Sequence, residues 1–204
     1  MVDALDSGSS VRKDVGVQVP SSAPFLVNIH ICVSFQSAGR PFNMKLPSKT
    51  RVSYANGYRE LGMHQDAFEE LEKIDPTQQN DRQVLACRLA IHMDLEDWAA
   101  IVDISRELAL QNPKEPEWWI NWAFGARRLE SLSAAEVILH EALEALPNEP
   151  CIHFNLGCYA CVQGRLAEAK DRLLRAIKLA PSLRKSALED EDLTVLRDWL
   201  RRSG

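Results

Sequence analysis

Residues 150–183 read PCIHFNLGCYACVQGRLAEAKDRLLRAIKLAPSL, and the stretch directly before them, residues 116–149, reads PEWWINWAFGARRLESLSAAEVILHEALEALPNE. The two stretches have equal length and share one pattern of residue types. Some residue types recur at this spacing, and we call such a set of equivalent positions a column. One column is a proline, at Pro113, Pro147 and Pro181, and another is a small or apolar residue, at Ala67, Ile101, Ala135 and Ala169. A fixed period of about 34 residues is typical of stacked helical hairpins, each of which buries its apolar face only against its neighbours. The sequence therefore predicts an all-α solenoid.

The period divides most of the chain into repeated units. We expect four helical hairpins, at about 48–81, 82–115, 116–149 and 150–183, and a capping helix at about 185–202, in a solenoid that spans 48–202. Gly62 and Gly164 fall at turns inside their hairpins, where a residue that is free to adopt positive φ relieves strain. The last segment alternates leucines and charged residues at helical spacing, and an amphipathic helix of this kind covers the end of a stack.

The hairpins resemble the tetratricopeptide repeat (TPR). The matching residues of the fourth hairpin are Leu156, Gly157, Ala160, Gly164, Ala169, Leu173, Ala176 and Pro181. Those of the first are Tyr54, Ala55, Tyr58, Gly62, Ala67, Leu71 and Ile74, and those of the third are Trp119, Trp122, Ala123, Ala126, Ala135, Leu139, Ala142 and Pro147. The second hairpin is degenerate, because Arg88 and Ser105 stand where the family has apolar residues. The resemblance implies a right-handed α-solenoid of antiparallel hairpins and a protein or peptide partner, whose identity it does not give.

The first part of the chain has a different composition. Residues 1–47 are rich in serine and proline and show no helical periodicity, and we interpret them as an N-terminal tail that is disordered or is a non-native extension. The stretch GSSVRKDVGVQVPSSAP, residues 8–24, resembles the conceptual translation of a transfer-RNA gene, as in reading frames extended too far upstream. Met44 is the start that this resemblance implies.

Composition limits the classes of partner. The net charge of −5 argues against nucleic acid as the partner, because proteins that bind it usually carry a basic surface. No stretch approaches the roughly 18–20 apolar residues that span a bilayer, so we expect no membrane insertion. The five cysteines are odd in number and widely spaced, which favours reduced thiols and a cytoplasmic location.

The resemblance also implies a site. The family's first helices line a concave groove, and its groove positions carried over to this chain include Asn56, Ala90, Met93, Asn121, Phe124, Arg127, Phe154, Asn155 and Cys158. Asn121 and Asn155 stand one repeat apart, and their amides have both a donor and an acceptor for the backbone of an extended peptide. The apolar residues among them suit a hydrophobic peptide or an amphipathic helix. The alternative is that some of these residues pack against the capping helix or a second protomer.

The predicted function is that of an adaptor or co-chaperone that holds a peptide segment, with no enzymatic activity, cofactor or metal. The sequence has no glycine-rich phosphate loop, nucleophile elbow or paired-histidine motif. Cys151 and Cys161 would stand about 15 Å apart along a helix, which is too far for one zinc ion with ligands at about 2.3 Å. The rival interpretations are a small secretion-type chaperone that holds an unfolded client, and a self-associating structural unit without a peptide ligand. A third is RNA binding, which the tryptophans Trp118, Trp119 and Trp122 suggest and which the net charge and the 34-residue period oppose.

Overall fold

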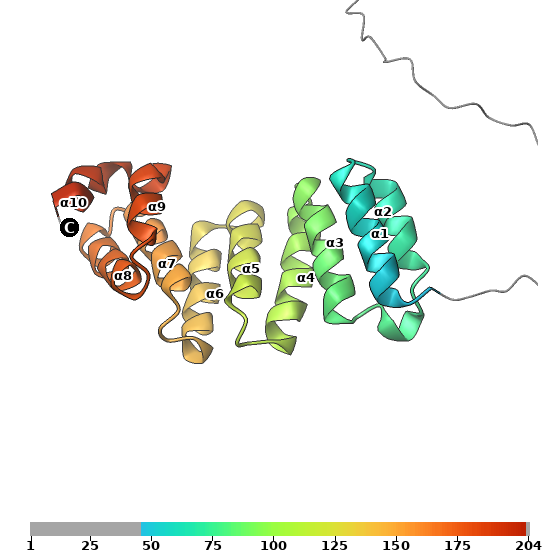
Figure 1. Ribbon diagram of the computed structural model, residues 1–204. Helices are drawn as coiled ribbons and strands as arrows, with labels where there is room; N and C mark the ends of the chain where they lie inside the picture. Colours follow the sequence, from blue (N-terminus) through green and yellow to red (C-terminus); the bar gives the residue numbers. More distant parts are fainter. Residues whose placement is uncertain (1–45, 203–204) are drawn as a thin grey trace, which may run out of the picture. The chain divides into compact units, whose positions relative to one another are not determined.

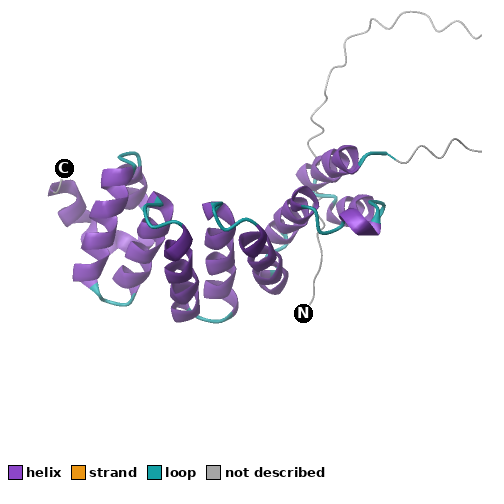
Figure 2. Cartoon of the chain, turned by 90° about the horizontal axis from the view of Figure 1, so that it is seen from below, coloured by secondary structure: helices purple, strands orange, loops and turns teal. Residues whose placement is uncertain are grey.

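The computed structural model describes residues 46–202, and the regular structure in this range is all helical. The helix pairs are α1 (Ser48–Glu60) with α2 (His64–Glu72), α3 (Arg82–Asp94) with α4 (Trp98–Gln111), α5 (Pro116–Leu129) with α6 (Leu132–Ala145), and α7 (Pro150–Val162) with α8 (Leu166–Leu179). A short 3-10 helix, η1 (Pro76–Gln78), links the first two pairs. Figure 1 shows the pairs following one another in chain order, and Figure 2 shows the short loops that join them. The all-α fold class is confirmed. The interpretation of residues 1–47 as a tail falls almost wholly on residues 1–45, which lie outside the described part of the chain.

The turn inside each hairpin is closed by the same hydrogen bond. The backbone N–H of Met63 donates to the carbonyl of Tyr58 at 2.9 Å, and the same bond in the second hairpin runs from Asp97 to His92, at 3.0 Å. It recurs in the third and fourth hairpins. In three of the four hairpins the residue before the donor adopts positive φ, as at many helix ends, whereas Glu130 of the third hairpin has φ of −118°. Glycine supplies that residue in the first and fourth hairpins, but Glu96 supplies it in the second, with φ of 53°.

The small-residue columns of the sequence form the centre of the stack. Ala67, Ile101, Ala135 and Ala169 are all fully buried. Leu71, Leu139 and Leu173 form a second buried column, in which Ser105 takes the leucine position of the second hairpin. Small residues let neighbouring helices approach and large ones fill the space between them. The hydroxyl of Ser105 is buried without a hydrogen-bond partner among the described residues, so the degenerate repeat retains the fold at a cost in stability.

The core consists of two clusters that meet at α3. The smaller cluster joins the first hairpin to α3 through Val84, Cys87 and Ile91. The larger cluster runs from α3, through Leu85 and Leu89, to the C-terminal segment. Successive residues of one helix therefore belong to different clusters, and α3 is the element that ties the first hairpin to the others.

The C-terminal segment differs from the single capping helix expected at 185–202. It consists of α9 (Leu183–Glu189), a 3-10 helix η2 (Glu191–Leu196) and α10 (Arg197–Arg202). Asp190 ends α9 because its backbone is extended, with ψ of 130°, and its carboxylate accepts a hydrogen bond from the backbone N–H two residues on. The break turns η2 onto α7 and buries Leu193 and Leu196.

No helix in residues 46–202 combines the length and the apolar content that crossing a bilayer requires.

Candidate peptide-binding groove

A hollow of about 280 Å³ opens between the first helices of the first three hairpins. Its lining residues are Arg59 from α1, then Ala86, Leu89, Ala90, Met93 and Asp94 from α3, and Glu117, Trp118 and Asn121 from α5. Three of the residues predicted from the sequence, Ala90, Met93 and Asn121, are thus brought together. Because no second helix contributes to the lining, the hollow belongs to the face that the resemblance assigns to the groove.

The walls of the hollow combine an ion pair with unpaired donors. Nη1 of Arg59 lies 3.0 and 3.3 Å from the two carboxylate oxygens of Asp94, so these charges are largely compensated. Trp118 is only 9% exposed, yet its indole Nε1–H has no acceptor among residues 46–202. The side-chain amide of Asn121 is half-buried and also forms no hydrogen bond within this range. A buried donor without an acceptor is costly, and a ligand carbonyl would remove that cost.

Asn56 lies beside the hollow, at the contact between α1 and α3. Its side-chain oxygen accepts a hydrogen bond from the thiol of Cys87, with Sγ at 3.5 Å. Burial raises the pKa of Cys87, which keeps this thiol protonated and able to donate. The bond holds the Asn56 amide in place, and no acceptor among the described residues takes up its nitrogen.

Phe124 and Phe154 pack more closely against the protein than an open groove floor would require. The ring of Phe124 meets that of Trp98 edge-on, with centroids 5.7 Å apart, and the guanidinium of Arg128 lies over both rings. Phe154 is half-buried and packs against the larger core cluster. Both side chains are therefore only partly accessible to a ligand.

Arg127 and Cys158 are occupied by the chain's own C-terminal segment. The guanidinium of Arg127 donates to both carboxylate oxygens of Asp192, at 2.6 and 3.1 Å, and lies over the ring of Tyr159. The thiol of Cys158 is buried and donates to the carboxylate of Asp190, with Sγ at 3.6 Å. Burial, together with these acidic neighbours, raises the pKa of Cys158. Of the two alternatives left open by the sequence, packing against the capping segment describes these two residues.

Asn155 differs from Asn121 although both occupy the same column. Its side-chain nitrogen donates to the carbonyl of Cys151, one turn earlier on α7, at 2.8 Å. The predicted pair of equivalent amides is therefore one free amide, Asn121, and one that is bonded to its own helix. Trp118, by contrast, was not among the predicted site residues. The only signal for it in the sequence is its place beside Trp119, which matches the family's core position.

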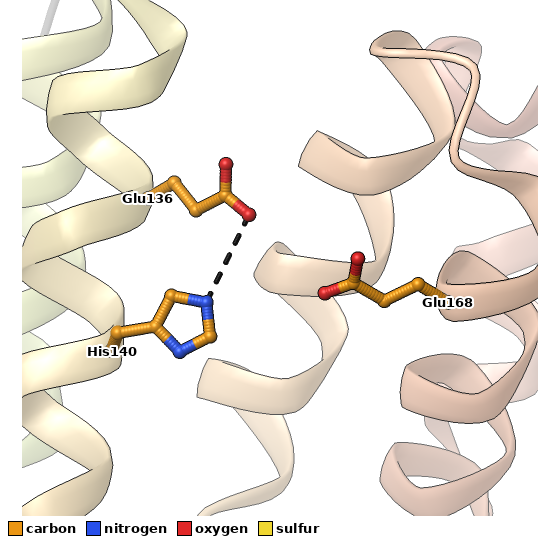
Figure 3. A group of neighbouring side chains, drawn as sticks. All are labelled: Glu136, His140 and Glu168. Atoms are coloured by element: carbon orange, nitrogen blue, oxygen red, sulfur yellow. Dashed lines mark ion pairs between the residues drawn. The ribbon is translucent and has the colours of Figure 1, made fainter.

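A second cluster of side chains has the composition of a metal site. Ligand atoms of Glu136 and His140 on α6 and of Glu168 on α8 all lie within 4.8 Å of one another, as Figure 3 shows for the side chains. The guanidinium of Arg165, however, forms ion pairs with both carboxylates. A cation at this place would have to displace that guanidinium, so we assign the cluster to an ion-pair network that links the third and fourth hairpins.

Comparison with known proteins gives likenesses in structure. No protein-family model matches the sequence, and no curated protein matches it at a significant level. A crystal structure of the MamA protein superposes with a TM-score of 0.59 at 14% identity, over 76% of this chain and 86% of that chain. Another MamA structure gives 0.57 at 14% identity, over 68% and 81% of the two chains. The structure of YrrB, described as a TPR protein with an unusual peptide-binding site, gives 0.55 at 14% identity, over 77% and 79%.

At this level of identity the likeness concerns the fold. It agrees with the repeated turn bond, the buried small-residue column and the pairing of helices described above. Residues 46–202 therefore have the fold of a tetratricopeptide-repeat solenoid, followed by a C-terminal capping segment.

Proposed function

We propose that this protein is a cytoplasmic adaptor that holds an extended peptide segment of a partner protein against the first helices of its hairpins. The observation that carries the proposal is the hollow between α3 and α5, where the apolar Ala90 and Met93 adjoin two unpaired polar groups, on Trp118 and Asn121. The peptide-binding site named for YrrB supports the same use of this fold.

The chemistry of the hollow suits an apolar side chain next to a peptide carbonyl. Its volume of about 280 Å³ is near the lower end for ligand pockets, which favours one side chain or two over a compact small molecule. An extended peptide presents one carbonyl and one N–H per residue, which pair with the indole donor of Trp118 and with the amide of Asn121. The fourth hairpin contributes less to this groove, because η2 packs on α7 and the thiol of Cys158 is bonded to Asp190. In the third hairpin, Arg127 on α5 is paired with Asp192 of η2.

A displayed library of linear peptides, selected on the full chain, tests the proposal. We expect enriched peptides to share an apolar anchor. Trp118→Phe keeps an aromatic ring and removes the donor together with part of the indole's volume, and Asn121→Ala removes only the amide. Each should weaken binding by roughly three- to tenfold, which corresponds to the usual net worth of one hydrogen bond. Met93→Glu, which places a charge on the apolar wall, should abolish it.

Asn155→Ala is the matched control, because it removes the same side chain from the same column but at a site where the amide is bonded to its own helix. We expect this variant to bind the selected peptides as the parent does. If Asn155→Ala weakens binding as much as Asn121→Ala, or if neither Met93→Glu nor Trp118→Phe has an effect, the peptide lies elsewhere and the proposal fails.

A further inference from the structure

A second surface, on the outer side of α1, carries the stacking face of an interior hairpin. The guide is Gly125 on α5. A Cβ built on Gly125 would lie 2.9 Å from Cγ2 of Ile101 and 3.0 Å from Cγ2 of Val102, both on α4. The preceding hairpin thus seats two branched side chains in the notch that this glycine leaves, and no other residue type admits them so closely.

Gly57 is the same position two repeats earlier, because the repeat spacing carries this column from Gly57 through Ile91 to Gly125. Among the described residues, a Cβ built on Gly57 would meet nothing within 4 Å. The neighbouring Tyr54 and Tyr58, which occupy the columns of Trp122 and Ala126, are 51% and 36% exposed. In the interior repeat the corresponding alanine, Ala126, is buried. Within residues 46–202, the first hairpin therefore has the stacking face without a hairpin that covers it.

The α1 face is defined by Ser53, Tyr54, Gly57, Tyr58 and Leu61, which line a hollow of about 350 Å³. Leu61, at 75%, is the most exposed of the large apolar residues in residues 46–202. Exposed apolar side chains that adjoin one another on one helix usually mark a contact surface. Since α1 satisfies its backbone hydrogen bonds internally, the surface suits a packed helix and not an added strand.

We propose that the α1 face binds one amphipathic helix of a partner protein, in the manner in which α5 binds α4. The inference goes beyond the groove of the proposed function and uses none of its residues. The stacking interface of the solenoid continues across α1 without a change of register, so the occupant carries a branched apolar side chain, as Ile101 and Val102 do, to fill the notch at Gly57. Lys49 and Glu60 stand at the two ends of α1 and form no ion pair within the described range. They favour a helix with an acidic and a basic residue about 16 Å apart.

A second copy of this chain does not supply that helix by simple stacking. The helix that would continue the solenoid at the other end is α8, and α9 packs on it, while Lys170 on α8 lies over the ring of Trp199. Leu200 on α10 is buried as well. Head-to-tail association would first require these contacts of the capping segment to break.

The test uses a displayed library of helices in which the frame of residues 97–112 is kept and the apolar positions are varied among Ala, Val, Ile and Leu. A helical frame is needed because isolated helices of this length are marginal in water. Selection on the full chain should enrich helices with Val or Ile at one fixed position. Gly57→Leu fills the notch and Leu61→Asp places a charge on the surface, and each should lower affinity at least about tenfold. Leu110→Asp is the matched control, because Leu110 is 62% exposed on another helix, and it should bind as the parent does.

Circular dichroism and binding of the groove peptides verify that the variants are folded, which separates a failure here from a failure of the proposed function. If Gly57→Leu and Leu61→Asp leave the affinity for the enriched helices unchanged, the proposal is overturned. So does a dimer in light scattering that Leu61→Asp converts to a monomer, because the occupant is then a second copy. A gain of at least tenfold in helix binding on removal of residues 1–45 also overturns it, because the chain's own segment is then the occupant.

Discussion

Leu193→Ala should open the covered end of the groove, and the thiols beneath it report that opening. Leu193 is fully buried where η2 lies on α7, and Cys158 and Cys161, at 3% and 4% exposure, are buried on the α7 side. Replacing a fully buried leucine by alanine costs about 2–5 kcal/mol, and here the loss falls on a segment that ends the chain. Taking about 3 kcal/mol, the population in which η2 is detached rises roughly a hundredfold.

Thiol alkylation followed by mass spectrometry, with the modified cysteine identified, measures this population. A thiol reacts as the thiolate and only when exposed, and burial raises the pKa of Cys158, so the covered state is protected in both respects. We expect Leu193→Ala to accelerate alkylation of Cys158 and Cys161 by up to the same hundredfold, since the rate follows the open population when closing is fast. Cys87, which is buried between the first two hairpins, should react at its parental rate.

Val195→Ala is the matched control on the same 3-10 helix, because Val195 is 70% exposed and its truncation removes little buried area. It should leave the alkylation rates of Cys87, Cys158 and Cys161 unchanged. Equal acceleration of Cys87 and Cys158 by Leu193→Ala would mean that the whole solenoid loosens. No acceleration at Cys158 would mean that η2 does not shield α7. Either result refutes the reasoning that the capping segment is a separate cover on the fourth hairpin.

Three further predictions concern stability. Glu96→Gly should raise the free energy of unfolding by about 0.5–1 kcal/mol in urea, because relief of about 1–2 kcal/mol of left-handed strain exceeds the entropy that glycine adds to the unfolded chain; an unchanged midpoint would contradict this. Ser105→Ala should stabilise by about 1 kcal/mol, since it removes a buried hydroxyl without a partner, and a loss of stability would show that the hydroxyl is bonded. His153 is buried, burial lowers its pKa, and its Nε2–H donates to the carbonyl of Pro147 at 2.9 Å. The folded state thus resists protonation, and stability falls as the pH drops below about 6.5, by at most about 1.4 kcal/mol per pH unit. His153→Gln keeps a donor and should flatten this part of the profile.

The fold was predictable because its determinants repeat. A column of small or apolar residues that recurs at one spacing specifies where neighbouring helices approach each other. Each repeat by itself indicates the same helical hairpin. Even the second hairpin, with Ser105 and Glu96 in place of leucine and glycine, follows its neighbours, since the stacking on both sides fixes its geometry. One repeat with atypical residues therefore does not change the fold that the other repeats predict.

The site was less predictable because its determinants do not repeat. Asn121 and Asn155 have the same column and the same chemistry, and only the local bond from Asn155 to the carbonyl of Cys151 separates a free amide from an engaged one. A repeat pattern shows what the repeats have in common, and so does not show a hydrogen bond that one repeat forms and another lacks. The break at Asp190 is of the same kind, since one carboxylate bonded to a nearby backbone N–H turns η2 onto α7 and covers part of the predicted groove.

The open and the covered parts of the solenoid follow from how the two core clusters are arranged. The larger cluster is closed at its C-terminal end by α9, η2 and α10. The first helix of the fourth hairpin, α7, is therefore covered by the C-terminal segment of the same chain. The smaller cluster has no comparable cover among the described residues, and the α1 face and the hollow between α3 and α5 lie on or beside it. A peptide bound in that hollow as proposed would contact Arg59 on α1 as well as α3 and α5, and would so add contacts across the junction of the two clusters. Because a ligand stabilises the state that it binds, a partner at either open surface would chiefly order the first hairpin, which the fewest core residues hold in place.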